Sequence, residues 1–228
     1  MEPVIEKLMN IQETDEVSFD YDWLFRTDYQ FKLLALLAVL ADSHLAYRGT
    51  LTDMCEFLGV GRSRSKDGTL KSNSRINSKI RDAIDSLEKD GLLKKIVDGH
   101  TFTLTLSKKA EKQRRVIRIQ REWVMIAKNY AQMPNKSVSV GWEPLLKVWL
   151  FLLDRGKSIA PITNRAIADA LNLSEGTVKH ARAALTNDIE AMISKRKTVF
   201  DPEKPNPFQC VGCEITVSAI ITDVRPVS

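Results

Sequence analysis

The chain contains few of the residues and segments that mark several large protein classes. It has three cysteines in 228 residues, too few for a disulfide framework and typical of a reducing compartment. The first twenty residues are acidic and lack an apolar core, so we expect no signal peptide there. The longest apolar stretch, residues 33–41, is too short to span a bilayer. These absences predict a cytoplasmic protein without a membrane partner.

Motifs of common enzymes and metal sites are also missing. The chain has no Gly-rich phosphate loop and no HExxH or GxSxG motif, and its three histidines are scattered. Cys210 and Cys213 form a lone CxxC pair, whereas zinc normally takes four ligands. We interpret this pair as packed or solvent-facing; the alternative is a metal shared across a dimer. We expect no enzymatic activity, no cofactor and no metal site.

The composition is that of an ordinary globular protein with apolar cores, at 43% hydrophobic and 28% charged residues. Its length suits two small domains or one large one. The chain has 34 Lys and Arg against 29 Asp and Glu, a net charge of +5. This mild excess permits nucleic acid as a partner but does not require it.

Residues 163–185 carry the pattern of two short helices joined by a tight turn. Thr163 and Ser174 are suited to cap the two helices, and Asn172 tolerates the left-handed backbone of the turn. Apolar residues at helical spacing give each helix an inward face: Ile167, Ala168 and Leu171 in the first, Val178, Ala181 and Leu185 in the second. This pattern resembles the helix-turn-helix family, with Asn172 in place of the usual glycine. The resemblance implies a second helix aimed at a groove of duplex DNA.

A weaker copy of the same order precedes this segment. Short extended lead-ins end at Trp23 and Trp123, which are 100 residues apart, and we interpret both tryptophans as core anchors. Apolar helices follow at 29–42 and 142–154, and shorter helices at 52–58 and 164–171. In the third helices Ile80, Ala83 and Leu87 align with Val178, Ala181 and Leu185, 98 residues later. The sequence therefore predicts an internal duplication; the alternative is a loose alignment of two helical stretches.

The offset between the copies falls from 113 to 98 residues, which locates an insertion at 61–75 of the first copy. This stretch is rich in Gly, Ser, Arg and Lys, a composition typical of a mobile basic loop. Two interpretations are open: a solvated surface insertion, or a phosphate-binding arm beside the third helix that becomes ordered on DNA.

Each third helix is followed by the pattern of a β-hairpin. In the first copy, a helix at 74–89 ends near Gly91, and strands at 92–97 and 101–106 flank an Asp98-Gly99 turn. In the second, a strand begins near Ala191, a long loop includes residues 195–197, and a strand returns at 214–221. Three helices and a hairpin resemble the winged-helix family over most of residues 17–106. The resemblance implies that the third helix enters the major groove and that the hairpin contacts DNA beside it.

We therefore expect a mainly α fold with small β-hairpin wings, arranged as two tandem winged-helix domains. The expected organisation is an acidic N-terminal segment at 1–16, a first domain at 17–107 with its insertion at 61–75, a basic linker at 108–122, and a second domain at 123–228 with an enlarged wing.

The expected DNA-contacting residues lie on the outward faces of the third helices and in the insertion. Arg and Lys favour guanine, Asn favours adenine, and His or Ser can donate to a base edge or a phosphate. The set is Ser174, Thr177, Lys179, His180 and Arg182 in the second copy, and Asn77, Ser78, Lys79, Arg81, Arg62, Arg64, Lys66, Lys71 and Arg75 in the first. The alternative is that these are only the solvated faces of core helices.

The function that this resemblance implies is sequence-dependent binding of double-stranded DNA. The chain would act as a transcription regulator or a replication-initiation protein of a bacterium, plasmid or phage, and a homodimer or a protein partner is compatible with either role. The alternative is a winged-helix protein-interaction module that docks on a replication or immunity complex. Charge on the third helices favours DNA readout, whereas exposed apolar patches favour protein docking.

Overall fold

The computed structural model describes residues 16–42, 44–60, 63–64, 70–71, 74–107, 115–155, 161–200 and 208–217. In segments 63–64, 70–71, 193–200 and 208–217 the description is of the backbone alone. Residues 1–15 of the expected acidic segment lie outside the described residues, and so do Arg62, Lys66 and residues 108–114 of the expected linker.

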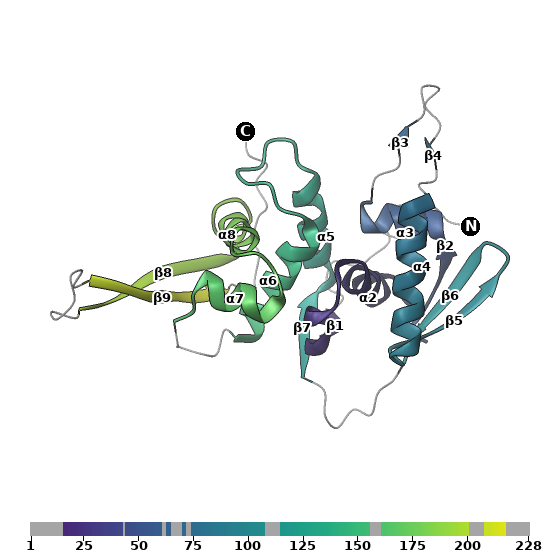
Figure 1. The fold of residues 1–228 in the computed structure, drawn as a ribbon, viewed down its shortest axis with the longest axis horizontal. Helices are drawn as coiled ribbons and strands as arrows, with labels where there is room; N and C mark the ends of the chain where they lie inside the picture. Colours follow the sequence, from purple (N-terminus) through teal and green to yellow (C-terminus); the bar gives the residue numbers. More distant parts are fainter. Residues whose placement is uncertain are drawn as a thin grey trace. The chain divides into compact units, whose positions relative to one another are not determined.

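Within these residues the protein has a mixed α/β structure with seven α-helices and small antiparallel sheets. The expected combination of helices with small antiparallel β-structure is confirmed at this level. The chain divides into two compact units, unit 1 (Met1–Val124) and unit 2 (Met125–Ser228), which Figure 1 draws in purple to teal and in teal to yellow.

Unit 1 is built around the apolar helix α2 (Asp28–Leu40), whose side chains Phe31, Leu33, Leu34, Leu36 and Leu37 are fully buried. This helix is buried on most sides because helices α3 (Leu51–Leu58) and α4 (Ser74–Lys89) and the sheet all contact it. The sheet has the strand order β2 (Ala46–Thr50), β6 (Thr101–Leu106), β5 (Leu93–Asp98), and both pairings are antiparallel. Helix α4 contacts both α2 and strand β5 (Figure 1).

The turns around the hairpin follow the expected chemistry. Gly91 ends α4 with φ +68°, and Gly99 has φ +57° in the turn between β5 and β6. Glycine adopts positive φ without the steric cost of a Cβ atom. The predicted helix, turn and hairpin are confirmed.

A second sheet in unit 1 pairs the two lead-in segments with each other. Strand β1 (Glu16–Asp20) runs antiparallel to β7 (Val116–Gln120), with Val17 opposite Ile119 and Phe19 opposite Ile117. Strand β1 continues into the 3-10 helix η1 (Tyr21–Phe25), and β7 continues into α5 (Arg121–Gln132). Trp23 and Trp123 are both buried, as expected of core anchors. The segment 116–120, which we expected within the linker, is a paired strand of unit 1.

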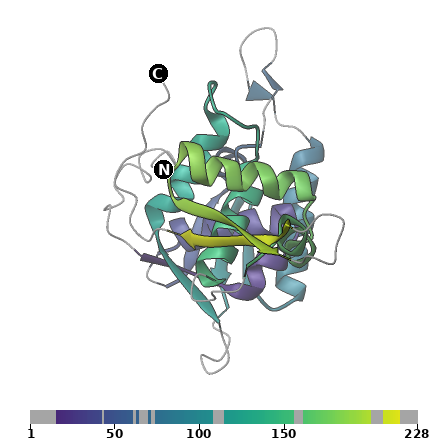
Figure 2. The same ribbon diagram turned by 90° about the vertical axis from the view of Figure 1, so that its left-hand side faces the viewer.

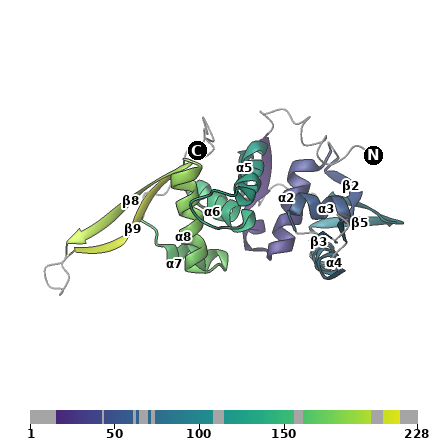
Figure 3. The same ribbon diagram turned by 90° about the horizontal axis from the view of Figure 1, so that it is seen from above.

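Unit 2 contains most of α5, then α6 (Trp142–Arg155), α7 (Asn164–Leu171) and α8 (Glu175–Ala183). Helix α8 contacts both α6 and α7 and ends in a π-helical turn, η3 (Ala184–Asp188). Figure 2 shows α8 lengthwise, in light green. Strands β8 (Met192–Phe200) and β9 (Phe208–Val217) pair as a long hairpin that extends away from the helices of this unit (Figures 1 and 3).

The second hairpin is larger than expected. Residues 195–197, which we expected in a loop, belong to β8, where Lys195 lies opposite Glu214 and Lys197 opposite Gly212. The returning strand begins at Phe208, six residues before the predicted start. The run of charges at 195–197 obscured a strand whose backbone hydrogen bonds do not depend on side-chain polarity.

The two units repeat the same helix ends at one spacing. Thr50 caps α3 and Thr163 caps α7; Gly59 (φ +63°) and Asn172 (φ +52°) follow the same two helices in left-handed conformation. Each equivalent pair is separated by 113 residues, the predicted offset. The predicted inward residues of the third helices are all buried: Ile80, Ala83 and Leu87 in α4, and Val178, Ala181 and Leu185 in the helix and turn at 175–188.

The insertion contains a short hairpin that the sequence did not predict. Strand β3 (Ser63–Arg64) pairs antiparallel with β4 (Leu70–Lys71). Arg64 and Lys71, two of the expected DNA-contacting residues, are therefore placed by this backbone pairing.

No helix in the part of the chain that the structure describes combines the length and apolar character needed to cross a bilayer.

Candidate functional site

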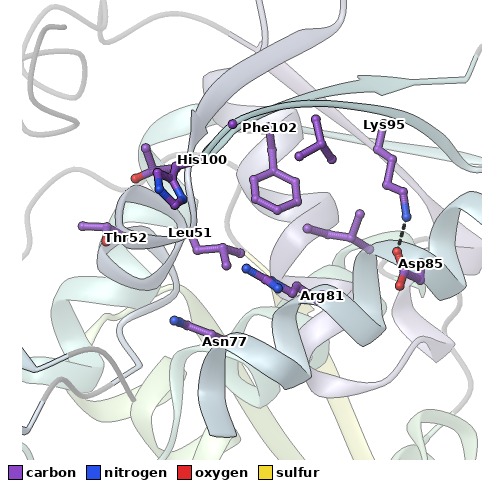
Figure 4. Close-up of a pocket in the computed structure, with 12 residues that line it drawn as sticks. Leu51, Thr52, Asn77, Arg81, Asp85, Lys95, His100 and Phe102 are labelled. Carbon is purple, nitrogen blue, oxygen red and sulfur yellow. Dashed lines mark hydrogen bonds and ion pairs between the residues drawn. The ribbon is translucent and has the colours of Figure 1, made fainter. Parts of the chain in front are cut away.

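A groove of about 690 Å³ opens in unit 1 between α4, the start of α3 and the β5–β6 hairpin (Figure 4). Buried apolar side chains, including Ile84 and Phe102, contribute to its wall. The exposed residues Thr52, Arg81 and His100 also line it, one from each of the three surrounding elements. The groove thus combines an apolar wall with polar groups that come from α3, α4 and the hairpin.

Two of the predicted contact residues, Arg81 and Asn77, line this groove. They lie one helical turn apart on α4, and Figure 4 shows both side chains projecting from the helix into the groove. Among the described residues Arg81 makes no ion pair or hydrogen bond, so its guanidinium can serve a ligand. Asn77 is half-buried and its Oδ1 accepts a hydrogen bond from Cys55 Sγ at 3.6 Å, which ties its side chain to α3.

Lys95 in the same groove forms ion pairs with carboxylates of the protein itself. Its ammonium contacts the Asp85 carboxylate and lies 3.2 Å from Glu88 Oε2, both on α4. Hydrogen bonds to Asp85 first, and then to Glu88, raise the pKa of Lys95. This network fastens strand β5 to α4 and offsets the Lys95 charge with two carboxylates.

The other predicted residues of α4, Arg75, Ser78 and Lys79, do not line the groove. Lys79 reaches the side of α2, where its Nζ lies 5.5 Å from the centroid of the Tyr29 ring. Ser78 and Asp82 are exposed neighbours, with Ser78 Oγ 3.4 Å from Asp82 Oδ2. Arg75 is exposed near the start of the helix. The predicted set on α4 is therefore divided between the hairpin side, the outer face and the α2 side.

In unit 2 the first turn of α8 is held by its own cap. Ser174 Oγ accepts a hydrogen bond from Thr177 N at 3.0 Å, and the two hydroxyl oxygens lie 2.7 Å apart. Lys179 and His180 are exposed one turn further along. Ser174, Lys179 and His180 thus lie on a solvent-facing surface, as predicted.

Arg182 departs from the prediction because it is buried, with 9% of its surface exposed. Its guanidinium donates a hydrogen bond to Asn164 Oδ1 at the start of α7. Helical spacing placed this residue on the outward face, but a long side chain can fold back onto a neighbouring helix. Arg182 links α7 to α8 and does not belong to the exposed surface.

The C-terminal end of this helix is fixed from another direction. Tyr130 Oη on α5 donates to Asp188 Oδ2 at 2.5 Å, and Ser137 Oγ donates to the same oxygen at 2.6 Å. Burial and then the hydrogen bond to Asp188 raise the pKa of Tyr130 to about 12. These bonds join α5 and the loop after it to η3.

Thr52, Lys95 and His100 are among the polar residues of the groove that sequence reasoning missed. Each lies near a feature that was identified, namely a helix start, a strand and a hairpin turn. The position of His100 directly after the Asp98-Gly99 turn was the available indication, because a hairpin tip is accessible to a ligand.

Comparisons with known proteins give no relative: no family model, no curated protein and no solved structure matches the chain.

Proposed function

We propose that the chain is a tandem winged-helix protein that binds double-stranded DNA in a sequence-dependent way. In unit 1 the order helix, strand, two helices and hairpin, with the strand order β2-β6-β5, supports a winged-helix assignment. In unit 2 the order α6, α7, α8 and hairpin, with equivalent helix caps 113 residues later, supports a second copy.

The observation that carries this proposal is the polar side of α4 that faces the hairpin groove. The Arg81 guanidinium lies there without a hydrogen bond or ion pair to the described residues, and Asn77 lies one turn before it. Arginine forms paired hydrogen bonds with guanine and asparagine with adenine, and each good pair is worth about 1–3 kcal/mol of discrimination. In unit 2, Lys179 and His180 on α8 are the corresponding candidates.

Two linked units fit a long, asymmetric DNA site. Linkage raises the effective concentration of the second unit once the first is bound, so modest contacts by each unit suffice. Such a site suits both a transcription regulator and a replication-initiation protein, and the proposal covers both roles in a bacterium, plasmid or phage.

The protein-docking alternative is favoured by one feature, the apolar exposure of strand β5. Ile96 is 68% exposed and Val97 is 52% exposed, on an edge strand of the sheet. Edge strands with apolar side chains are ready to pair with another chain. A docking role predicts that substitution of these two residues, and not of Arg81, abolishes partner binding.

The proposal is tested by selecting random duplexes with the purified full chain and then measuring affinity for the winning sequence as a function of salt. We expect one enriched sequence and an affinity that falls steeply with salt, because bound Lys and Arg release counterions from phosphates. A protein that enriches no sequence and shows no salt dependence would remove the DNA-binding proposal.

Substitution of the groove residues tests the reading surface directly. Arg81→Ala and Asn77→Ala should each weaken binding to the selected site by about 1–3 kcal/mol and relax its sequence preference at one position. Arg48→Ala is the matched control, since Arg48 is an exposed arginine on β2 and does not line the groove. Equal effects of Arg81→Ala and Arg48→Ala on the selected sequence would contradict base reading by α4.

A further inference from the structure

Two lysines from different helices converge on one tyrosine on the α2 side of α4. Lys32 Nζ on α2 lies 5.6 Å from the centroid of the Tyr29 ring, and Lys79 Nζ on α4 lies 5.5 Å from the same point. We call Tyr29, Lys32 and Lys79 the lysine–tyrosine cluster. It lies outside the groove, because none of the three residues lines it.

The cluster holds more positive charge than its own acid offsets. Asp28 Oδ1 lies 2.7 Å from Lys32 Nζ and forms an ion pair with it, in which the Asp28 side chain is exposed and the Lys32 side chain is 14% exposed. Lys79 is exposed and brings a second ammonium to the same ring. Two ammonium groups near one point repel each other, and an anion between them would relieve that repulsion.

Tyr29 provides a platform and a hydrogen-bond donor at this point. Its side chain is half-buried at the start of α2, and its ring attracts cations to its face. Burial and then the nearby Asp28 carboxylate raise the pKa of Tyr29, so its hydroxyl remains protonated at neutral pH and can donate to an anion.

The cluster and the groove lie on opposite sides of the same helix. Asn77 and Arg81 line the groove on the hairpin side, whereas Lys79, between them in sequence, reaches toward α2. A duplex that presents base edges to the first side would have a phosphate backbone close to the other, because the major groove that admits a helix is bordered by two backbones.

We propose that the lysine–tyrosine cluster is a phosphodiester-binding site that holds a DNA backbone on the α2 side of α4 while Asn77 and Arg81 read base edges on the hairpin side. This inference rests on the proposed DNA-binding function. It assigns α2 a role in DNA contact that the sequence did not indicate, and it assigns Lys79, which the sequence predicted only to contact DNA, to phosphate binding.

The two kinds of contact differ in their dependence on salt and sequence. A phosphate contact carries no sequence information, and each neutralised phosphate contributes about 0.9 to the slope of log affinity against log salt. The Lys32→Gln/Lys79→Gln variant should therefore lower the magnitude of that slope by about 1–2 and leave the selected sequence unchanged. Lys32→Arg/Lys79→Arg keeps both charges and should retain the slope.

The experiment measures affinity for the selected duplex at several salt concentrations with the full chain and each variant. Lys94→Gln is the matched control, because it removes an exposed lysine of β5 that belongs to neither the groove nor the cluster; its slope should equal that of the wild type. Lys79→Gln alone leaves the Asp28–Lys32 ion pair in place and should also lower the slope. It provides the test if the double variant fails to fold.

Ethylation of individual phosphates gives an independent readout. We expect interference at one or two phosphates with the wild type, and its loss at those positions with the cluster variants. Two results would contradict phosphate binding by the cluster without contradicting the proposed function. One is a wild-type slope of log affinity against log salt in the folded glutamine variants, and the other is a changed sequence preference at an unchanged slope. If the wild type binds no duplex, both the proposed function and the proposed phosphate site are wrong.

Discussion

Lys128 shows how one side chain can make stability depend on pH. It lies on α5 with only 5% of its surface exposed, and burial lowers its pKa to about 8. The unfolded chain therefore binds this proton more tightly than the folded chain does. Below pH 8 the full free-energy cost of burying this ammonium opposes folding. That cost disappears as the pH rises toward the ordinary lysine pKa of 10.5.

The lowered pKa of Lys128 leads to a prediction for Lys128→Met. At pH 7 the variant should be more stable than the wild type by on the order of 2–3 kcal/mol, because the folded chain no longer buries an ammonium. The difference should shrink between pH 8 and pH 10.5. Urea unfolding of both proteins at pH 7, 8 and 10 measures it; a difference that stays constant over this range would show that the titration of Lys128 does not affect stability.

Arg182 illustrates what residue spacing leaves undetermined. The periodicity of the helix correctly identified Val178, Ala181 and Leu185 as buried, but it could not reveal that the preceding helix offers Asn164 as a partner. The direction of a long side chain depends on its tertiary neighbours. The same uncertainty applied to Lys79, which a neighbouring helix supplies with an aromatic ring.

At the scale of elements, the ends of α3 and α7 have the same geometry with different residues. Gly59 ends α3 with φ +63°, and Asn172 ends α7 with φ +52°. A residue with a Cβ atom is strained in this region by roughly 1–2 kcal/mol, and asparagine is less penalised than most.

The shared geometry predicts opposite effects at the two positions. Asn172→Gly should leave stability unchanged or raise it slightly, whereas Gly59→Ala should lower the free energy of unfolding by about 1 kcal/mol. Chemical denaturation of the full chain provides the measurement. Val60→Ala is a useful control for a small change beside Gly59; if it costs as much as Gly59→Ala, the backbone conformation is not the cause.

The helices and hairpins that the sequence predicted correctly are those with strong local determinants. Caps, left-handed turns and an apolar face at helical spacing identified α3, α7 and α8, and the Asp98-Gly99 turn identified β5 and β6. Strand β2 was missed because its extended conformation depends on hydrogen bonds to a distant strand, β6, which lies more than 50 residues later in the sequence. Gly49 within it is explained by packing alone, since a Cβ atom there would lie 2.2 Å from Tyr47 Oη.

Helix α5 and the groove were missed for related reasons. The alternating start at 117–119 correctly indicated a strand, but the change to helical periodicity at Arg121 was not recognised. The groove joins Thr52, Arg81 and His100, which are separated by up to 48 residues, so only tertiary packing brings them together. Local patterns could place each residue on an element but could not place the elements around one space.

At the scale of the whole molecule, the β1–β7 sheet changes where the first folding unit ends. Sequence patterns placed the end of the first domain at residue 107, whereas β7 at 116–120 pairs with β1. Without β7, the buried faces of Val17 and Phe19 would lose the apolar partners Ile119 and Ile117.

This pairing predicts that a fragment of residues 1–124 is more stable and more soluble than one of residues 1–107. The comparison uses thermal unfolding and sedimentation of both fragments at equal concentration. The fragment 1–124 carrying Ile117→Asp and Ile119→Asp is the control, and it should behave like the shorter one because charged residues cannot cover the apolar face. Equal stability of the two unmodified fragments would show that β7 is dispensable.

The β1–β7 pairing also sets an order of events during biosynthesis. Strand β1 is among the first described segments to be translated, yet its partner is made about a hundred codons later. At typical elongation rates of about 5–20 residues per second, the apolar face of β1 waits on the order of 5–20 s before Ile117 and Ile119 exist. The helices and the three-stranded sheet of unit 1 are complete in the nascent chain before that moment. The N-terminal strand is therefore the segment of this unit most exposed to chaperones and proteases while the ribosome is still at work.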